Sequence, residues 1–140
     1  MEKILIIDDN VLIRKSVRSM LQKLNYDVLE AEDGETGLAM VRKEKPDLVI
    51  TDFQMPGIDG LEVLSEIRKM KVNLPVILLT AYGDVVLTIK SIQLGAFDYL
   101  EKPIEPEQLK KTIENALKSV KVSKSIDKEI EDAVSSDSIL

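Results

Sequence analysis

Apolar residues follow two different spacings along the chain, and the two spacings alternate. Short runs rich in Ile, Leu and Val predict buried strands, because they are brief and apolar on both faces. Between these runs, apolar residues recur every three or four positions, as in amphipathic helices. The expected strands cover Lys3–Ile7, Asp27–Ala31 (with weaker alternation), Leu48–Asp52, Pro75–Leu79 and Phe97–Leu100.

An expected helix follows each expected strand. The first starts after Asn10, a plausible N-cap, and the others run over about 34–43, 61–70, 83–94 and 106–120. In the first helix the pattern turns one set of residues inward: Ile13, Val17, Met20, Leu21 and Leu24. It leaves Arg14, Lys15 and Arg18 on the solvated side. Strands and helices that alternate in this way predict an α/β fold, with a parallel sheet covered by helices on both faces.

Polar side chains stand where four of these strands end. The residues concerned are Asp8 and Asp9, Asp52, Thr80 with Ala81, and Lys102 with Pro103. Because parallel strands present their carboxyl ends at one edge of the sheet, we expect Asp8, Asp9, Asp52, Thr80 and Lys102 to share one cleft. Three carboxylates beside one ammonium group repel one another, so a divalent cation is their natural complement.

Each of these residues also has an ordinary structural explanation. Asp52 is of a type common where a strand gives way to a turn, and Asp8-Asp9 suits a turn before a helix. Thr80 can bond to nearby backbone, and Lys102 can be a surface lysine. Their occurrence at four strand ends of one sheet favours a functional site.

The same residues resemble the receiver domain of bacterial two-component response regulators. The matching motifs are Asp8-Asp9, Asp52 with Met55-Pro56-Gly57 and Asp59-Gly60, Thr80-Ala81, Gly95-Ala96-Phe97-Asp98-Tyr99, and Lys102-Pro103. The resemblance covers roughly Met1 to Val120 and is strongest to receivers of nitrogen-regulator-type transcription activators. It implies a (βα)5 flavodoxin-like fold, with five parallel strands in the order 2-1-3-4-5.

The resemblance also implies a role for each residue at the strand ends. Asp52 is the expected phosphoacceptor, and a sensor histidine kinase or phosphotransfer protein is the expected donor. Mg²⁺ is the expected cofactor, held by Asp9, Asp52 and the backbone carbonyl of Gln54, with Asp8 acting through a bound water. The expected phosphoryl-binding groups are Thr80, Ala81 and Lys102, and the family's Lys102–Pro103 bond is cis.

Further implied roles concern switching and output. Thr80 and Tyr99 correspond to the family's switch pair, and Gln54 and Tyr82 to the positions that tune dephosphorylation. On a helical wheel of residues 83–94, one stripe faces the sheet: Val85, Ile89 and Ile92. The wheel places Leu87 and Leu94 outward, so we expect them to form a partner face with Tyr99. This face would control an effector domain or protein, or a phosphorylation-dependent homodimer, most plausibly in transcription regulation.

The amino-acid composition limits the ligands, partners and cellular location that we expect for this chain. The formal charge of −6 argues against nucleic-acid binding by this chain. The absence of Cys excludes thiolate metal sites, and the absence of His places any phosphohistidine on another protein. No apolar stretch approaches the roughly 20 residues of a membrane span. These features fit a cytoplasmic protein with no membrane partner.

The last twenty residues differ in character from the expected receiver unit, residues 1–120. Residues 121–140 are polar and rich in Ser, which predicts a tail or linker. Ile126, Ile130, Ala133 and Val134 recur at helical spacing, however, so a short amphipathic helix stays open. The chain could be a stand-alone receiver or a piece of a longer regulator.

Two other function classes are weaker. A haloacid-dehalogenase-type phosphatase also uses an Asp nucleophile with Mg²⁺, but it needs a second Asp two positions later, where this chain has Gln54. A degenerate receiver that only binds proteins would be expected to have lost the acids, the Thr or the Lys, all of which are present. We therefore expect a regulatory phosphoacceptor rather than an enzyme with its own substrate.

Overall fold

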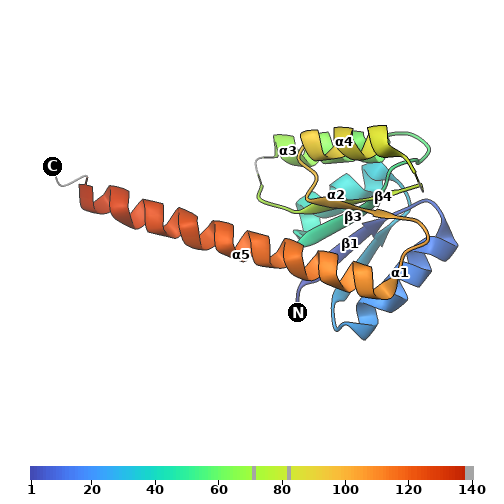
Figure 1. The fold of residues 1–140 in the computed structure, drawn as a ribbon, viewed down its shortest axis with the longest axis horizontal. Helices are drawn as coiled ribbons and strands as arrows, with labels where there is room; N and C mark the ends of the chain where they lie inside the picture. The colour runs from blue at the N-terminus through green and yellow to red at the C-terminus, as the bar shows by residue number, and fades with distance from the viewer. Residues whose placement is uncertain (71, 82, 138–140) are drawn as a thin grey trace.

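Strands and helices alternate along the whole chain in the computed structural model, which describes residues 1–70, 72–81 and 83–137 (Figure 1). The strands are β1 (Lys3–Ile7), β2 (Asp27–Ala31), β3 (Leu48–Asp52), β4 (Val76–Thr80) and β5 (Asp98–Glu101). The helices are α1 (Val11–Lys23), α2 (Gly34–Glu44), α3 (Gly60–Lys69), α4 (Val85–Gln93) and α5 (Pro106–Asp137). The first three strands match the predicted ranges, and the last two are displaced by one residue.

All five strands are parallel, in the order β2-β1-β3-β4-β5. The pairing places Ile7 opposite Thr51, and Asp52 opposite Leu79. The carboxyl ends of β1, β3 and β4 therefore lie side by side, as predicted. The flavodoxin-like order 2-1-3-4-5 is confirmed.

Two separate cores cover the two faces of the sheet. Alternate residues of β1 point to opposite faces, so Ile4 and Ile6 join one core while Leu5 and Ile7 join the other. The first core packs the sheet against α1 and α5, and the second packs it against α2 and α3. Because both faces are covered, the middle strands are fully buried, which explains their continuous apolar sequence.

Short polar residues fix where several helices begin. Asn10, Asp33, Asp59 and Asp84 are N-caps, and the side chain of each accepts a hydrogen bond from a backbone N–H of the first turn. The predicted cap Asn10 is confirmed. These caps anchor four helices next to the carboxyl edge of the sheet, where the candidate site lies.

Helix α4 is rotated relative to the sequence-based wheel. Leu87 is buried, with 7% of its surface exposed, whereas Ile89 and Ile92 are exposed. The wheel assumed that the most apolar stripe faces the sheet, but the buried positions of α4 are Leu87 and the small polar Ser91. The Ser91 hydroxyl donates to the Thr88 carbonyl, so its burial leaves no unpaired donor. The prediction that Leu87 is exposed was wrong, whereas Leu94 is exposed as predicted.

Helix α5 extends far beyond the receiver unit. Its first half packs on the sheet through Leu109, Ile113 and Ala116, and its second half projects away from the domain (Figure 1, orange to red). The helix continues without a break from Pro106 to Asp137. Residues 121–137, where the composition predicted a tail or linker, are therefore part of α5.

No helix within residues 1–70, 72–81 and 83–137 combines the length and the apolar composition of a membrane span.

Candidate functional site

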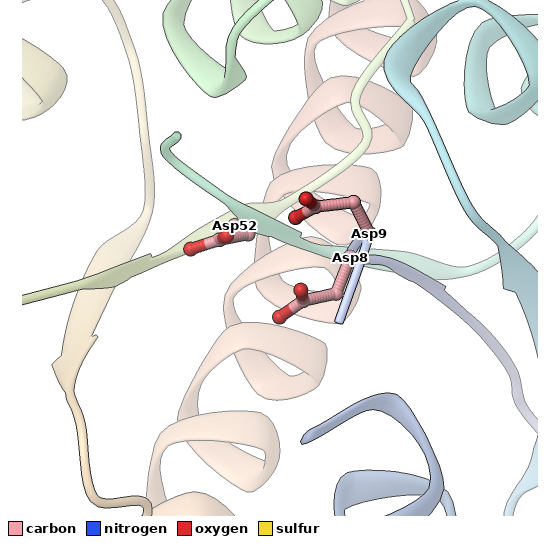
Figure 2. A group of neighbouring side chains, drawn as sticks. All are labelled: Asp8, Asp9 and Asp52. Carbon is pink, nitrogen blue, oxygen red and sulfur yellow. The ribbon is translucent and has the colours of Figure 1, made fainter. Parts of the chain in front are cut away.

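Three carboxylates meet at the carboxyl edge of the sheet. Asp8 and Asp9 follow β1, and Asp52 ends the neighbouring strand β3 (Figure 2). One carboxylate oxygen from each residue lies within 4.8 Å of the other two. Asp8 and Asp52 are buried and Asp9 is exposed. The cluster thus opens to solvent on the Asp9 side, and like charges are concentrated in it.

Asp8 is the most constrained member of this cluster. Its side chain is 0% exposed, and its Oδ1 accepts a hydrogen bond from the Asn10 backbone N–H at 2.9 Å. Its Oδ2 is buried and accepts no hydrogen bond. Burial is the main reason that the pKa of Asp8 is raised, and the charges of Asp52 and Asp9 raise it further. The Asn10 N–H and the Lys102 ammonium oppose this rise. An ionised Asp8 is therefore under-compensated by its protein neighbours.

Lys102 links the end of β5 to Asp52. Its Nζ lies 2.8 Å from Asp52 Oδ1 and 3.8 Å from Asp8 Oδ2. Asp52 Oδ1 also accepts a hydrogen bond from the Phe53 backbone N–H at 3.0 Å. The Lys102–Pro103 peptide bond is cis, as the resemblance implied. One ammonium group thus faces two buried carboxylates, which leaves the site short of positive charge.

Thr80 supplies a second unpaired polar atom. It ends β4, it is 1% exposed, and its Oγ1 makes no hydrogen bond. Ala81 follows it and lines a pocket of about 160 Å³ beside Asp52. Gln54 and Lys102 line the same pocket. The structure therefore brings the predicted strand-end residues of β3, β4 and β5 to one small opening.

Close packing at Gly60 fixes the loop that follows Asp52. The Gly60 N–H donates to the Phe53 carbonyl at 2.8 Å. A Cβ on Gly60 would lie 2.5 Å from the Asp52 carbonyl oxygen and 2.9 Å from Phe53 Cα, so any larger residue would push the strand end away. Glycine is required here by this close backbone approach rather than by an unusual φ angle.

The donor set fits Mg²⁺. This hard cation takes oxygen ligands and is commonly bound by one or two carboxylates together with water. Three carboxylate groups converge in this cluster, and the buried Oδ2 of Asp8 accepts no hydrogen bond. A bound cation would neutralise the charge that Lys102 leaves uncompensated.

Arg14 is a site neighbour that the sequence analysis placed in solvent. Its side chain is only 15% exposed, and its guanidinium donates to the backbone carbonyl of Asp8 at 2.8 Å. Its Nε pairs with Glu30 on β2 at 3.1 Å, and Glu30 also pairs with Arg18. The expectation of a solvated Arg14 was therefore wrong, whereas Lys15 and Arg18 are exposed. The available signal was Glu30, an acidic residue near the end of the strand next to β1.

Tyr99 and Leu87 are two further residues for which the sequence predicted a role. Tyr99 is half-buried on β5 and pairs in register with Leu78 of β4, two residues before Thr80. Four further residues line the pocket and were not predicted there: Phe53, Leu79, Asp84 and Leu87. Buried Leu87 lies at the site instead of on the outer face of α4. The prediction for Tyr82 lies outside the described residues.

Comparisons with known proteins agree with this geometry. The family model of the response regulator receiver domain matches residues 4–114. A probable transcriptional regulator ycf27 from Porphyridium aerugineum is 43% identical over 119 residues, which are 85% of this chain and 49% of the relative. The chain therefore spans about half the length of this curated relative.

Two solved structures are similar over most of the chain. A response regulator receiver domain protein from Clostridium thermocellum superposes with a TM-score of 0.83 at 35% identity, and the match covers 87% of this chain and 98% of the other. NtrX from Brucella abortus gives a TM-score of 0.86 at 32% identity over 90% of this chain and 29% of the other. The match to NtrX agrees with the predicted likeness to nitrogen-regulator receivers. With its parallel five-stranded sheet and its acidic strand ends, the chain belongs to the response regulator receiver domain family.

Proposed function

We propose that this chain acts in the cytoplasm and that Asp52 accepts a phosphoryl group from a phosphohistidine of a sensor histidine kinase or phosphotransfer protein. The observation that carries this proposal is the contact of Lys102 Nζ with Asp52 Oδ1 at 2.8 Å, beside the buried Oδ2 of Asp8, which accepts no hydrogen bond. A strand-end carboxylate in a buried pocket, with one ammonium group already directed at it, is suited to act as a nucleophile toward an anionic group. Residues 1–120 form the receiver unit in this proposal.

The chemistry follows from the positions of the side chains. A carboxylate oxygen of Asp52 attacks phosphorus, and the P–N bond of the donor breaks, so that the electron pair leaves with the imidazole nitrogen. Lys102 neutralises charge on the phosphoryl oxygens. The unpaired Thr80 hydroxyl can donate to one of them, and the small side chain of Ala81 leaves room in the pocket. Phosphoryl transfer depends mainly on such positioning and charge neutralisation.

Asp8, Asp9 and Asp52, together with the backbone carbonyl of Gln54, would hold Mg²⁺, which supplies charge neutralisation at this site when bound. In the absence of the cation, the repulsion that raises the pKa of Asp8 also opposes the arrival of an anionic donor. We therefore expect both phosphorylation and dephosphorylation to depend on the cation.

The output would pass through α4 and β5. Thr80 and Tyr99 lie on adjacent strands, so a Thr80 hydroxyl drawn toward the phosphoryl group would free space for the half-buried Tyr99. Helix α4 carries the exposed apolar residues Val85, Val86, Ile89, Ile92 and Leu94. These residues replace Leu87 in the proposed partner face, which changes its presentation when the population shifts toward the phosphorylated conformation.

The whole protein would act in transcription regulation, as the names of similar regulators suggest. Because the chain spans about half the length of such relatives, the effector is either a further domain or a separate protein. The phosphatase alternative gains no support, because the residue two positions after Asp52 is Gln54, which cannot act as a general acid.

The test is intact-mass measurement after incubation with Mg²⁺ and acetyl phosphate. The wild-type chain should gain one phosphoryl group, and Asp52→Asn should gain none, because an amide is a poor nucleophile. Asp47→Asn is a matched control, since Asp47 precedes the amino end of the same strand and its carboxylate accepts from the Lys3 N–H instead. Equal labelling of wild type and Asp52→Asn would reject the assignment.

A further inference from the structure

The projecting half of α5, residues 121–137, is a helix whose described side chains are not buried against the receiver unit. Its described side chains, those of residues 121, 122 and 125–133, are all exposed. A helix of about this length is marginal in water on its own propensity, because helices in proteins gain most of their stability from packing an amphipathic face. A second helix packed against this segment would supply the apolar contacts that stabilise such a helix.

The projecting helix has such a face. Val122, Ile126 and Ile130 are 58%, 50% and 56% exposed. At about 100° per residue these side chains fall within roughly 80° of one another, and Ala133 falls between them. The centre of the stripe is rotated by about 100° from the face through which Leu109 packs on the sheet. It is therefore a separate contact surface and not a continuation of the receiver core.

The charges along the helix indicate which partner fits. Residues 118–126 contain lysines and no acidic residue, whereas the charged residues within 127–137 are all acidic apart from Lys128. This order is unfavourable for an isolated helix, because acidic side chains near the C-terminus face the negative end of the macrodipole. The same order is favourable when a second copy runs in the opposite direction, because its basic segment then lies beside the acidic segment.

We propose that the projecting half of α5 pairs antiparallel with the same segment of a second copy of this chain. A twofold axis at Ile126 places Val122 of one copy level with Ile130 of the other, and residues 118–121 of one copy level with residues 131–134 of the other. The contact is isologous, so it closes as a dimer. A parallel pair would instead set lysines beside lysines and acids beside acids, which is repulsive.

The helix surface near the receiver leaves room for this arrangement. The line of the stripe continues toward the receiver unit through Ser119 and Asn115, which are both exposed and uncharged. The C-terminal end of the partner helix can therefore lie along the first half of α5 without displacing a core residue. The two receiver units then stand at opposite ends of the helix pair, with their phosphoacceptor sites unobstructed.

Sedimentation velocity of the full chain over a concentration series tests the pairing. The wild-type protein should reach twice the monomer mass, and Ile126→Ser combined with Ile130→Ser should remain monomeric. Leu12→Ser is the control, because Leu12 is an exposed leucine (79%) on α1, away from the projecting helix. A wild-type protein that stays monomeric, or a double variant that associates like wild type, would overturn the proposal.

Disulfide trapping tests the orientation, and the absence of native Cys makes it clean. A mixture of Val122→Cys and Ile130→Cys chains should give a mixed disulfide under mild oxidation. Val122→Cys alone should not cross-link, because the two copies of residue 122 would stand about 12 Å apart along the axis, beyond the roughly 7 Å that a disulfide spans. Efficient cross-linking of Val122→Cys alone would show a parallel pair and overturn the proposal.

The association should be the same in Asp52→Asn as in wild type, with or without acetyl phosphate. This result separates the helix pairing from the proposed phosphorylation of Asp52, since either can fail while the other holds. An association that appears only on phosphorylation of wild type would assign it to the α4 face and overturn the pairing proposed here.

Discussion

The middle of the central strands and their carboxyl ends are equally buried but differ in what burial does to stability. In the middle, Ile6 and Ile50 are fully buried among aliphatic neighbours. At the ends, Asp8 and Thr80 are buried with polar atoms that make no hydrogen bond. Burial of an aliphatic side chain stabilises the fold by about 1.5–3 kcal/mol. An unsatisfied buried polar group costs about 1–3 kcal/mol.

This difference shows where the fold is adapted to function. A strand end that exists only to terminate a strand would have its polar atoms paired within the protein. Here Asp8 Oδ2 and Thr80 Oγ1 are buried without a hydrogen bond at the ends of β1 and β4. The pKa of Asp8 is raised, and the Lys102 ammonium lies 3.8 Å from its Oδ2. We infer that the middle of the sheet provides the stability with which the protein holds this unfavourable cluster in place.

Truncation in the middle of the sheet should have the largest effect. Ile50→Ala should lower the free energy of unfolding by about 2–5 kcal/mol, because it removes buried methyl groups from the central strand and leaves a cavity. Urea unfolding measures this change. Ile92→Ala, at an exposed position of α4 (46%), is the control and should change stability by no more than about 0.5 kcal/mol. Similar losses for both variants would contradict the described burial of the strand.

An intermediate effect is expected from loss of Arg14, which donates a hydrogen bond to the backbone of the acidic cluster. Arg14→Ala removes the donor to the Asp8 carbonyl, so Mg²⁺ affinity should fall about 10-fold, at the lower end of the range for residues that orient metal ligands. Isothermal titration calorimetry measures this affinity. Arg18→Ala is the matched control, since Arg18 pairs with the same Glu30 but not with Asp8. Equal losses of affinity in both variants would assign the effect to general electrostatics.

The smallest effect is expected on the outer face of α4. Val86→Ser, at a position that is 79% exposed, should change the free energy of unfolding by no more than about 0.5 kcal/mol and leave Asp52 phosphorylation intact. Leu87→Ser, at the next position, should be strongly destabilising because Leu87 is buried beside the site. Thermal unfolding of the two variants decides between this orientation of α4 and the one that the wheel predicted.

The periodicity of apolar residues and the polar residues at the strand ends predicted most of the fold, and also that the site residues lie together. The apolar runs located the strands because both faces of the sheet are covered, and parallel pairing then fixed which residues meet. The orientation of α4 could not be obtained in this way. That helix is apolar on several sides, so periodicity alone does not identify the side that faces the sheet.

Two further features were not obtained from the local pattern. Arg14 is held inward by Glu30, sixteen residues later, and a wheel of α1 contains no information on β2. Helix α5 runs without a break to Asp137, whereas the polar composition of residues 121–140 predicted a tail or linker and left a short helix open.

The buried carboxyl group of Asp8 should make the stability of the fold depend on pH. Its raised pKa means that the folded state binds the proton more tightly than the unfolded chain does. Its contribution to stability is therefore most favourable at low pH and declines as the pH rises from about 3.9, the ordinary Asp value, through the folded pKa. One such group changes stability by no more than about 1.4 kcal/mol per pH unit. Asp8→Asn should remove this decline.

The central claim is that the buried acidic cluster destabilises the fold unless a cation is bound. The most direct test is calorimetric unfolding of wild type and Asp8→Asn at neutral pH, each with and without Mg²⁺. Without Mg²⁺, we expect Asp8→Asn to unfold at the same temperature as wild type or at a higher one, because one buried charge is removed. We also expect Mg²⁺ to stabilise wild type, because the cation binds the folded state, and to stabilise the variant much less. An Asp8→Asn protein that is clearly less stable without Mg²⁺, or that gains as much from Mg²⁺ as wild type does, would contradict the account.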